Sequence, residues 1–382
     1  MPNIGSDTLE LVALTLIPGL GPVRTRRVIE ALGSAATALG ASQRDLESVE
    51  GIGPGVASSV QKNKARALAD AERESARLEK VGGRIVAITD AEYPELLRPL
   101  PDAPLVLYVR GSLTPADRFA LGMVGSRKCS GYGLEQSARF AAALAQRGIT
   151  VVSGGARGID SSAHRGAVQA GGRTVVVLGC GLGHCYPPEN LGLFDAIVEE
   201  GRGAIVTELP TESPPEARNF PARNRLISGM SLGVLVVEAG RQSGALITAR
   251  QAAEEHGREV YALPGRVDSD TCQGSLDLLK AGGAQLVTTP EDIVESLEMP
   301  ARHAHHGTHA VRYTPEPARA EGLAVPGGEA GKKVYEACAE GRTPDQIGQV
   351  TGLEMHEVGT AITLLEIAGL VRRSGSRVER TR

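Results

Sequence analysis

The sequence predicts an α/β protein built on a Rossmann-like, doubly wound, mostly parallel sheet, with a helical module before the sheet and a winged helix after it. Between residues 81 and 299, short β-branched runs alternate with helical patterns, which is typical of parallel strands joined by right-handed crossovers. One run, residues 232–237 (LGVLVV), is almost continuously apolar, as expected of a strand buried on both faces. The length of 382 residues allows two or three domains.

The first 80 residues are predicted to form a helical module with an internal repeat, of SAM-like or double helix-hairpin-helix type. The segments IPGLGP (17–22) and EGIGPG (50–55) each precede a helical pattern, and Gly19 and Gly51 lie 32 positions apart. In such hairpins glycine lets backbone N–H groups approach a DNA phosphate closely. Ten basic and ten acidic side chains balance in this region, so a purely structural module or a protein-contact surface is an equal alternative.

The central segment, residues 81–299, is predicted to contain nine strands. Helical patterns such as residues 132–147 and 159–170 separate most of them. The strands are expected at 84–89, 105–109, 120–124, 150–153, 174–178, 204–207, 232–237, 259–262 and 285–287.

Three glycine-rich loops that carry arginine follow predicted strands, at residues 124–128 (VGSRK), 153–160 (SGGARGID) and 239–244 (AGRQSG). The carboxyl ends of parallel strands meet at one edge of the sheet, where ligands bind. A glycine-rich helix start also presents free N–H groups and the positive end of the helix dipole to an anion. Residues 123–173 hold seven basic and two acidic side chains. We therefore expect a phosphate-binding pocket, with the phosphates belonging to nucleic acid.

The segment 219–265 is predicted to contribute most to this pocket. Aromatic residues make up only 3% of the chain and tryptophan is absent, so base-stacking positions are few. Phe220 and Tyr132 lie beside basic residues and are the best stacking candidates, although either could pack in the core. The simpler alternative for the whole region is turn-forming glycine with solvated arginine. The candidate residues here are Phe220, Arg223, Asn224, Arg225, Ser243 and Gly244.

Several other sites are excluded by pattern, and no catalytic residue, cofactor or metal is predicted. Residues 179–183 (GCGLG) fail the dinucleotide spacing, and 327–333 fail the Walker spacing. Asp160 and His164 lie four apart, but a helix-start acid beside a polar histidine is the more common arrangement. Glu238 ends a strand without a second carboxylate. Five cysteines without a C-x-x-C pair indicate a reducing compartment, and we expect a cytoplasmic protein without a membrane segment.

The last 80 residues are predicted to hold a linker and a small domain. Residues 300–326 are rich in Ala, Pro, His and Gly and are expected to be a flexible linker. Residues 327–382 return to helical patterns, with Thr343 and Pro344 marking one helix start. A short strand pair near residues 370–378 completes a winged-helix pattern. Eight basic and eight acidic side chains balance here, so protein is as good a partner as DNA.

Together these motifs resemble the DNA-processing protein A family, also called DprA or Smf. The resemblance rests on VGSR (124–127), SGGARGIDSSAH (153–164), GCGL with YPPEN (179–190), FPARNRLISG (220–229), and the stretch from Ser243-Gly244 to ALPG (262–265). It covers nearly the whole chain.

The resemblance implies a homodimeric bacterial protein, not an enzyme, that binds single-stranded DNA during natural transformation and loads the recombinase RecA onto it. Where relatives carry Lys this chain has Arg157, which keeps the charge. The alternative is a nucleotide phosphoribohydrolase of the lysine-decarboxylase-like family, whose P-G-G-x-G-T-x-x-E loop is missing from residues 240–248. The DNA-binding positions implied by the resemblance are Gly125, Ser126, Arg127, Gly155, Arg157, Arg223, Asn224 and Arg225.

Overall fold

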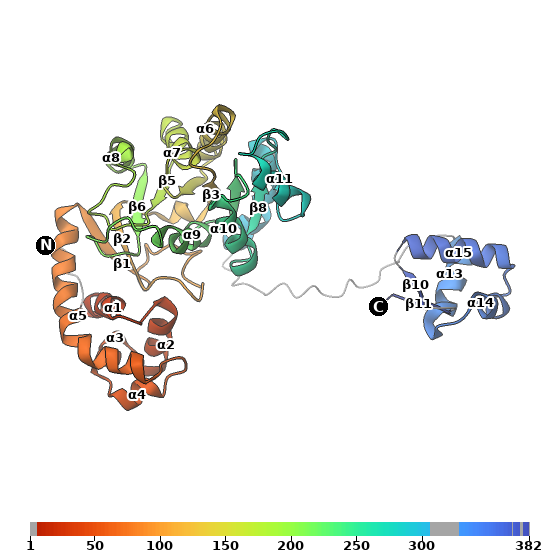
Figure 1. Ribbon diagram of the computed structural model, residues 1–382, viewed down its shortest axis with the longest axis horizontal. Coiled ribbons are helices and arrows are strands. Elements are labelled where there is room, and N and C mark those ends of the chain that lie inside the picture. The colour runs from red at the N-terminus through yellow and green to blue at the C-terminus, as the bar shows by residue number, and fades with distance from the viewer. Residues whose placement is uncertain (1–5, 306–327, 369, 375–376, 382) are drawn as a thin grey trace. The chain divides into compact units, whose positions relative to one another are not determined.

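The computed structural model describes residues 6–305, 328–368, 370–374 and 377–381. The chain divides into two compact units with a boundary between residues 308 and 309, and each is described by itself (Figure 1). The first unit contains a helical module and a nine-stranded sheet. Among the described residues, no helix is both long and apolar enough to cross a bilayer.

The helical module repeats its backbone conformation as well as its sequence. Gly19 and Gly51 have φ angles of 91° and 84°, a region that favours glycine. Two residues later, an extended glycine with ψ of 172° precedes a proline at the first helical position in both copies. The helices are α1 (Ser6–Leu16), α2 (Pro22–Leu32), α3 (Ala35–Gly40), α4 (Gln43–Glu47) and α5 (Pro54–Lys80). DNA contact by these hairpins stays a prediction.

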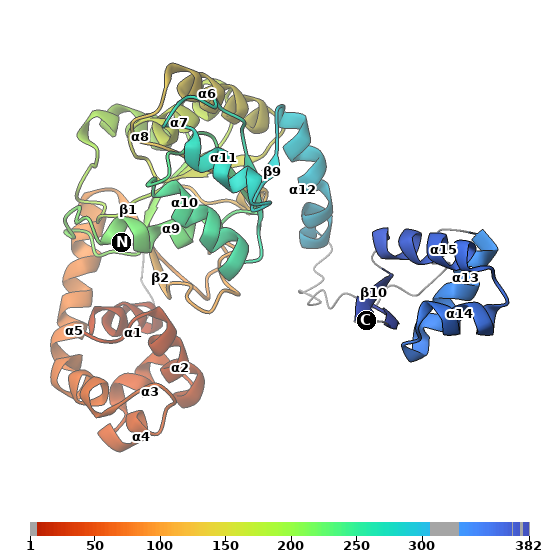
Figure 2. The ribbon, with the colours of Figure 1, turned by 45° about the vertical axis from the view of Figure 1, so that its right-hand side comes forward.

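Helix α5 joins the module to the sheet (Figure 2). A buried carboxylate on this helix ties it to the core. Glu74 is 2% exposed and accepts a hydrogen bond from the backbone N–H of Thr211. One turn later, Arg77 pairs with Glu212 at 3.4 Å. Thr211 and Glu212 belong to the loop 208–218, between β6 (Gly203–Thr207) and α9 (Asn219–Gly229). The module therefore holds one of the loops of the core.

All nine predicted strands are present in one sheet, in the order β1-β2-β6-β5-β4-β3-β7-β8-β9. Strands β1 and β2 pair antiparallel, as do β2 and β6, and the other pairs are parallel. The expectation of a large, mostly parallel sheet is confirmed. The strands not yet given are β1 (Gly83–Ala87), β2 (Val106–Gly111), β3 (Ala120–Val124), β4 (Thr150–Ser153), β5 (Thr174–Val177), β7 (Gly233–Val236), β8 (Glu259–Ala262) and β9 (Gln285–Leu286).

Helices cover both faces of the sheet because the strand residues alternate between two apolar clusters. Leu121 and Leu235 pack with Phe140 of α6, whereas Val234 packs with Leu226 of α9 on the other face. Figure 1 shows α6 and α7 on one side of the sheet and α9 and α10 on the other. The helices are α6 (Gly131–Gln146), α7 (Ile159–Gln169), α8 (Leu191–Glu199), α10 (Ala245–Arg250), α11 (Gln273–Lys280) and α12 (Pro290–His305), with short turns η1 (Pro115–Arg118) and η2 (Pro188–Asn190) and a π-helical turn η3 (Gln251–Glu255).

The strand order reverses direction between β3 and β7. From β3 the chain winds outward through β4, β5 and β6, and from β7 it winds the opposite way through β8 and β9. In open α/β sheets this switch point leaves a crevice outside the carboxyl ends of the strands, where ligands bind. The loops that follow β3, β4 and β7 are the three arginine-bearing, glycine-rich loops of the sequence.

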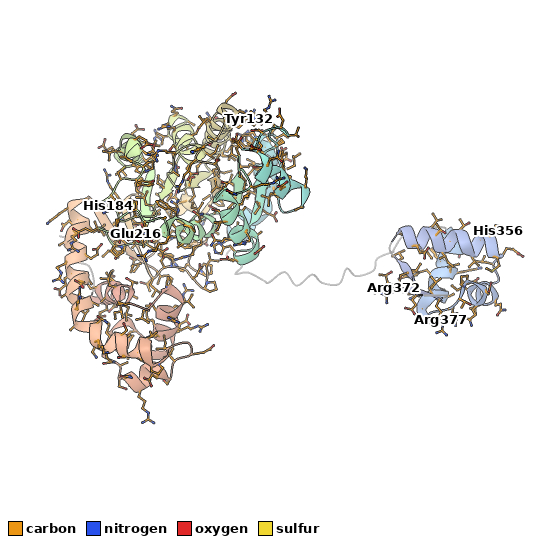
Figure 3. The ribbon with its side chains drawn as sticks, in the orientation of Figure 1. Tyr132, His184, Glu216, His356, Arg372 and Arg377 are labelled. Atoms are coloured by element: carbon orange, nitrogen blue, oxygen red, sulfur yellow. The ribbon has the colours of Figure 1, made fainter. Side chains whose placement is uncertain are left out.

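In its described residues, the second unit contains three α-helices and a two-stranded antiparallel sheet. Its apolar core includes Val334, Ile347 and Leu365, and Thr343 accepts the N–H of Gln346 at the predicted helix start. Figure 3 labels His356, Arg372 and Arg377 on this unit. The elements are α13 (Gly328–Ala337), η4 (Cys338–Glu340), α14 (Pro344–Thr351), α15 (Met355–Ile367), β10 (Val371–Ser374) and β11 (Arg377–Arg380).

The predicted linker differs from the structure at its start, because α12 extends to His305. Residues 300–305 are therefore helical, and the rest of that prediction, residues 306–326, lies outside the described residues.

Candidate functional site

A cavity of about 620 Å³ opens at the switch point between β3 and β7. Residues from all three glycine-rich loops line it, together with α9 and parts of the loops 208–218 and 178–187. The predicted convergence of these loops is therefore a feature of the fold. Of the sequence-predicted candidates, the lining includes Gly125, Ser126, Arg127, Phe220, Arg223, Asn224, Ser243 and Gly244.

An aromatic pair with an arginine over it forms one wall of the pocket. The ring centroids of Phe220 and Tyr186 lie 5.5 Å apart with the planes tilted by 46°. The guanidinium carbon of Arg127 lies 5.0 Å from the Phe220 centroid, within the range of a cation–π contact. Arg127 is exposed and the described structure gives it no carboxylate partner. An apolar aromatic surface thus lies next to an available cation.

Space for the Phe220 ring depends on Gly179. A Cβ at position 179 would lie 2.8 Å from Cδ1 of Phe220, closer than carbon atoms pack. This glycine belongs to the corner 179–183 that fails the dinucleotide spacing. Gly179 therefore leaves the space that the Phe220 ring occupies.

Arg223 forms the floor of the pocket and is held in place. Its side chain is 5% exposed, and it donates to the carbonyl oxygens of Gly154, at 2.8 Å, and Val177. Burial lowers the pKa of this guanidinium to about 10, while the Asp160 carboxylate acts in the opposite direction. Arg223 therefore contributes a fixed positive charge below the pocket.

Asp160 is the counter-charge to Arg223 and also shapes the second glycine-rich loop. It is 6% exposed and accepts the N–H of Ala156 at 3.3 Å. Burial raises the pKa of its carboxyl, and Arg223 opposes that rise. His164 bonds Thr174 at 2.6 Å, and burial lowers its pKa to about 3. These contacts are structural, and no group of three metal-ligating side chains occurs among the described residues.

The remaining lining candidates define the mouth of the pocket. The Asn224 amide donates to the carbonyl of Gly244 at 3.4 Å, which links α9 to the loop after β7. A Cβ at Gly125 would lie 2.4 Å from Ile159 Cγ1, so only glycine fits there. A Cβ at Gly244 would meet open space. Ser126 donates its N–H to the Glu238 carbonyl at 2.7 Å, which fixes the loop after β3.

Three sequence candidates lie outside the lining. Gly155 is buried with φ of 64°, and a Cβ there would lie 2.7 Å from Val176 Cγ1. Arg157 projects from the same loop and pairs with Glu189. Arg225 turns away from the cavity, with Glu208 and Asp102 as ion-pair partners.

Two further residues have roles that differ from those considered in the sequence. Glu238 accepts from the N–H of Ser130 at 2.8 Å and from its hydroxyl, and so anchors the start of α6. Tyr132 lies at the start of α6, well separated from Glu216 of the loop 208–218 in Figure 3. Its hydroxyl donates to the carbonyl of Pro264 at 3.3 Å, and it does not line the pocket.

Sequence reasoning missed Tyr186, the second aromatic residue of the pocket. The signal was available, because Tyr186 follows β5 by nine residues and therefore belongs to the same sheet edge. In the sequence, residues 179–190 fail the dinucleotide spacing and contribute to the family resemblance, and neither observation assigns a stacking role to Tyr186.

The fold and site define a class: a doubly wound α/β protein with a cationic, aromatic pocket at its switch point. Residues 84–298 match the model of the family described as DNA recombination-mediator protein A. The chain belongs to this family.

Similar proteins extend the match beyond the α/β core. Protein Smf of Escherichia coli strain K12 is 40% identical over 295 residues, covering 77% of this chain and 76% of that protein. Protein Smf of Synechocystis is 34% identical over 98% of this chain and 99% of its own length.

Solved structures agree in fold. DNA processing protein A of Streptococcus pneumoniae has a TM-score of 0.65 and 32% identity, covering 75% of this chain and 97% of that one. DNA processing protein A of Helicobacter pylori, described for its single-stranded DNA binding mode, has a TM-score of 0.50 and 27% identity over 57% of this chain and 97% of that one.

Proposed function

We propose that the pocket binds single-stranded DNA, and that the protein acts on such DNA in natural transformation and recombination. The observation that carries this proposal is the Arg127–Phe220–Tyr186 arrangement at the switch point. Sequence-independent binding of a single strand requires a basic track for phosphates and aromatic faces on which bases stack. The relative from Helicobacter pylori is described for binding this ligand, which supports the same ligand class here.

The pocket favours a single strand over a duplex. Its aromatic wall accommodates an unpaired base, and its glycine-rich loops suit contacts to backbone phosphates that carry no sequence information. We propose that Gly125, Ser126, Arg127, Phe220, Arg223, Asn224, Ser243 and Gly244 contact or directly support the strand, because they line the cavity. Arg157 joins this set at the rim, whereas the ion-paired Arg225 acts as a structural residue.

We expect the intact chain to bind a labelled single-stranded oligonucleotide more tightly than its duplex. Fluorescence anisotropy over a salt series measures this directly. The logarithm of the association constant should fall linearly with the logarithm of salt concentration, with a slope of about −0.7 per phosphate contacted on a single strand.

Equal affinity for both forms, or no binding, would contradict the proposal. Release of free base from a nucleoside monophosphate would favour the phosphoribohydrolase alternative. We propose that the protein is not such an enzyme, because Asp160 is the only carboxylate that lines the pocket in the described part of the chain, and it is bonded to Ala156.

We further propose that the protein acts in the cytoplasm as a homodimer that loads RecA onto the bound strand. The support is membership of the recombination-mediator family. RecA filaments should form faster on single-stranded DNA when the protein is present, and an unchanged rate of RecA ATP hydrolysis would contradict this role. Sedimentation of the intact chain tests the dimer independently.

The end modules complete the proposed architecture. The repeated hairpins support a helix-hairpin-helix relationship, because Gly19 and Gly51 share one backbone conformation. From residue 328 onward, the order of three described α-helices and an antiparallel strand pair supports a winged helix.

A further inference from the structure

An ion pair between Arg157 and Glu189 lies on the loops that flank the pocket. Nε of Arg157 donates to Oε1 of Glu189, and Nη2 donates to Oε2 at 2.9 Å. The two side chains are 50% and 48% exposed. A guanidinium holds a phosphate group through the same two parallel N–H···O bonds. The Glu189 carboxylate therefore occupies the position that two phosphate oxygens would take.

The backbone that carries Glu189 is fixed to the loop that carries Arg157. The neighbouring Asn190 is 1% exposed. Its amide donates to the carbonyl of Gly155 at 2.9 Å and to the Ser161 hydroxyl at 2.7 Å, on either side of Arg157 in the sequence. Buried hydrogen bonds thus fix the two backbone segments that carry Arg157 and Glu189. Most exposed ion pairs lack such support and depend on two mobile side chains.

The pair is also continuous with the pocket. Tyr186 lines the cavity and lies three residues before Glu189. Its ring packs against Phe220, over which Arg127 lies. Arg157 also contacts this pair, because Glu189 first and then a side-chain hydrogen bond with Tyr186 raise the pKa of its guanidinium. A strand whose base packs on the pair would therefore place a neighbouring phosphate near Arg157. An exposed ion pair of this kind adds little to folding stability. A role in binding therefore accounts better for the fixed geometry of the Arg157–Glu189 pair.

We propose that Glu189 fills, in the free protein, the phosphate site that Arg157 offers to the strand. This inference rests on the proposed binding of single-stranded DNA. The incoming phosphodiester has to displace the carboxylate from the two N–H donors of Arg157 before it can bind them. Glu189 consequently lowers the affinity and favours release of the strand, a property suited to a protein that passes DNA on.

Replacing Glu189 by glutamine should increase affinity for a single-stranded oligonucleotide by roughly three- to fivefold, the scale of one exposed ion pair. The E189Q change keeps the size and polarity of the side chain and removes its charge. Arg157→Ala should weaken binding. In the R157A background, E189Q should have no further effect, because the carboxylate then has no site to fill. Anisotropy titration of the four intact chains at one salt concentration measures the coupling.

Glu199→Gln is the matched control, because Glu199 is an exposed glutamate at the end of α8 and changes net charge equally. An unchanged or reduced affinity of E189Q, with normal binding by the unaltered chain, would overturn this inference alone. The same increase in the R157A background, or in E199Q, would also overturn it in favour of general charge repulsion. Failure of the unaltered chain to bind the oligonucleotide would overturn this inference and the proposed function together.

Discussion

Replacing Arg127 by alanine is expected to weaken single-stranded DNA binding roughly tenfold to hundredfold, the scale of a lost phosphate contact combined with a weakened stacking wall. Arg127 and Lys128 are the exposed cations of the described pocket lining, and of these the Arg127 guanidinium lies over Phe220. Its removal takes away one phosphate partner and exposes one face of the ring. The slope of log affinity against log salt should become shallower by about 0.7. Anisotropy titration at several salt concentrations measures both quantities.

Arg139→Ala is the control for this experiment. Arg139 is also exposed and also lies over a phenylalanine, with its guanidinium carbon 5.2 Å from the Phe140 centroid. It lies on α6 and does not line the pocket. If R127A and R139A change affinity equally, the pocket is not where the strand binds.

Replacing Arg223 by methionine is expected to destabilise the first unit by about 3–5 kcal/mol, because the change removes a buried charge that acts on Asp160 and donates to two buried carbonyls. The variant removes the arginine charge with the larger effect on Asp160, and the charge of Arg127 remains. It also removes the donor for the carbonyls of Gly154 and Val177. Urea unfolding of the intact chain, followed by far-ultraviolet circular dichroism, measures the loss in the transition of the larger unit.

The loss of folding stability caused by R223M should become smaller as the pH falls from 8 towards 5. Burial already raises the pKa of Asp160 in the folded state, and removal of Arg223 raises it further. The folded variant then binds a proton at a pH where the unfolded chain does not, so lower pH favours folding. The double variant D160N/R223M should recover much of the loss. A deficit that is independent of pH and unchanged in the D160N background would contradict the pairing.

The sheet could be predicted from the sequence because its strands are short, β-branched and buried. Residues 232–237 need no tertiary information to be recognised as a two-face-buried strand, and β7 spans Gly233–Val236. The convergence of the three loops also follows from topology alone, since the carboxyl ends of parallel strands share an edge.

The positions of individual side chains in the folded protein could not be predicted in the same way. Arg223 and Arg225 are two residues apart on α9, and so leave the helix on nearly opposite sides. One forms the floor of the pocket, and the other pairs with Glu208. Which side faces the cavity depends on how α9 packs on the sheet. The Arg157–Glu189 pair joins residues 32 positions apart and requires the folded loops.

The buried carboxylate of Glu74 determines where the chain can be truncated without disturbing the pocket. The loop 208–218 is tied to α5 through Thr211, and Pro215 and Ala217, which come later in the same loop, line the pocket. A fragment that starts at Gly83 would discard Glu74 and leave a buried N–H without an acceptor. In such a fragment the loop 208–218, which lines part of the pocket, would no longer be held in place. DNA affinities measured on the isolated core would therefore not apply to the intact chain.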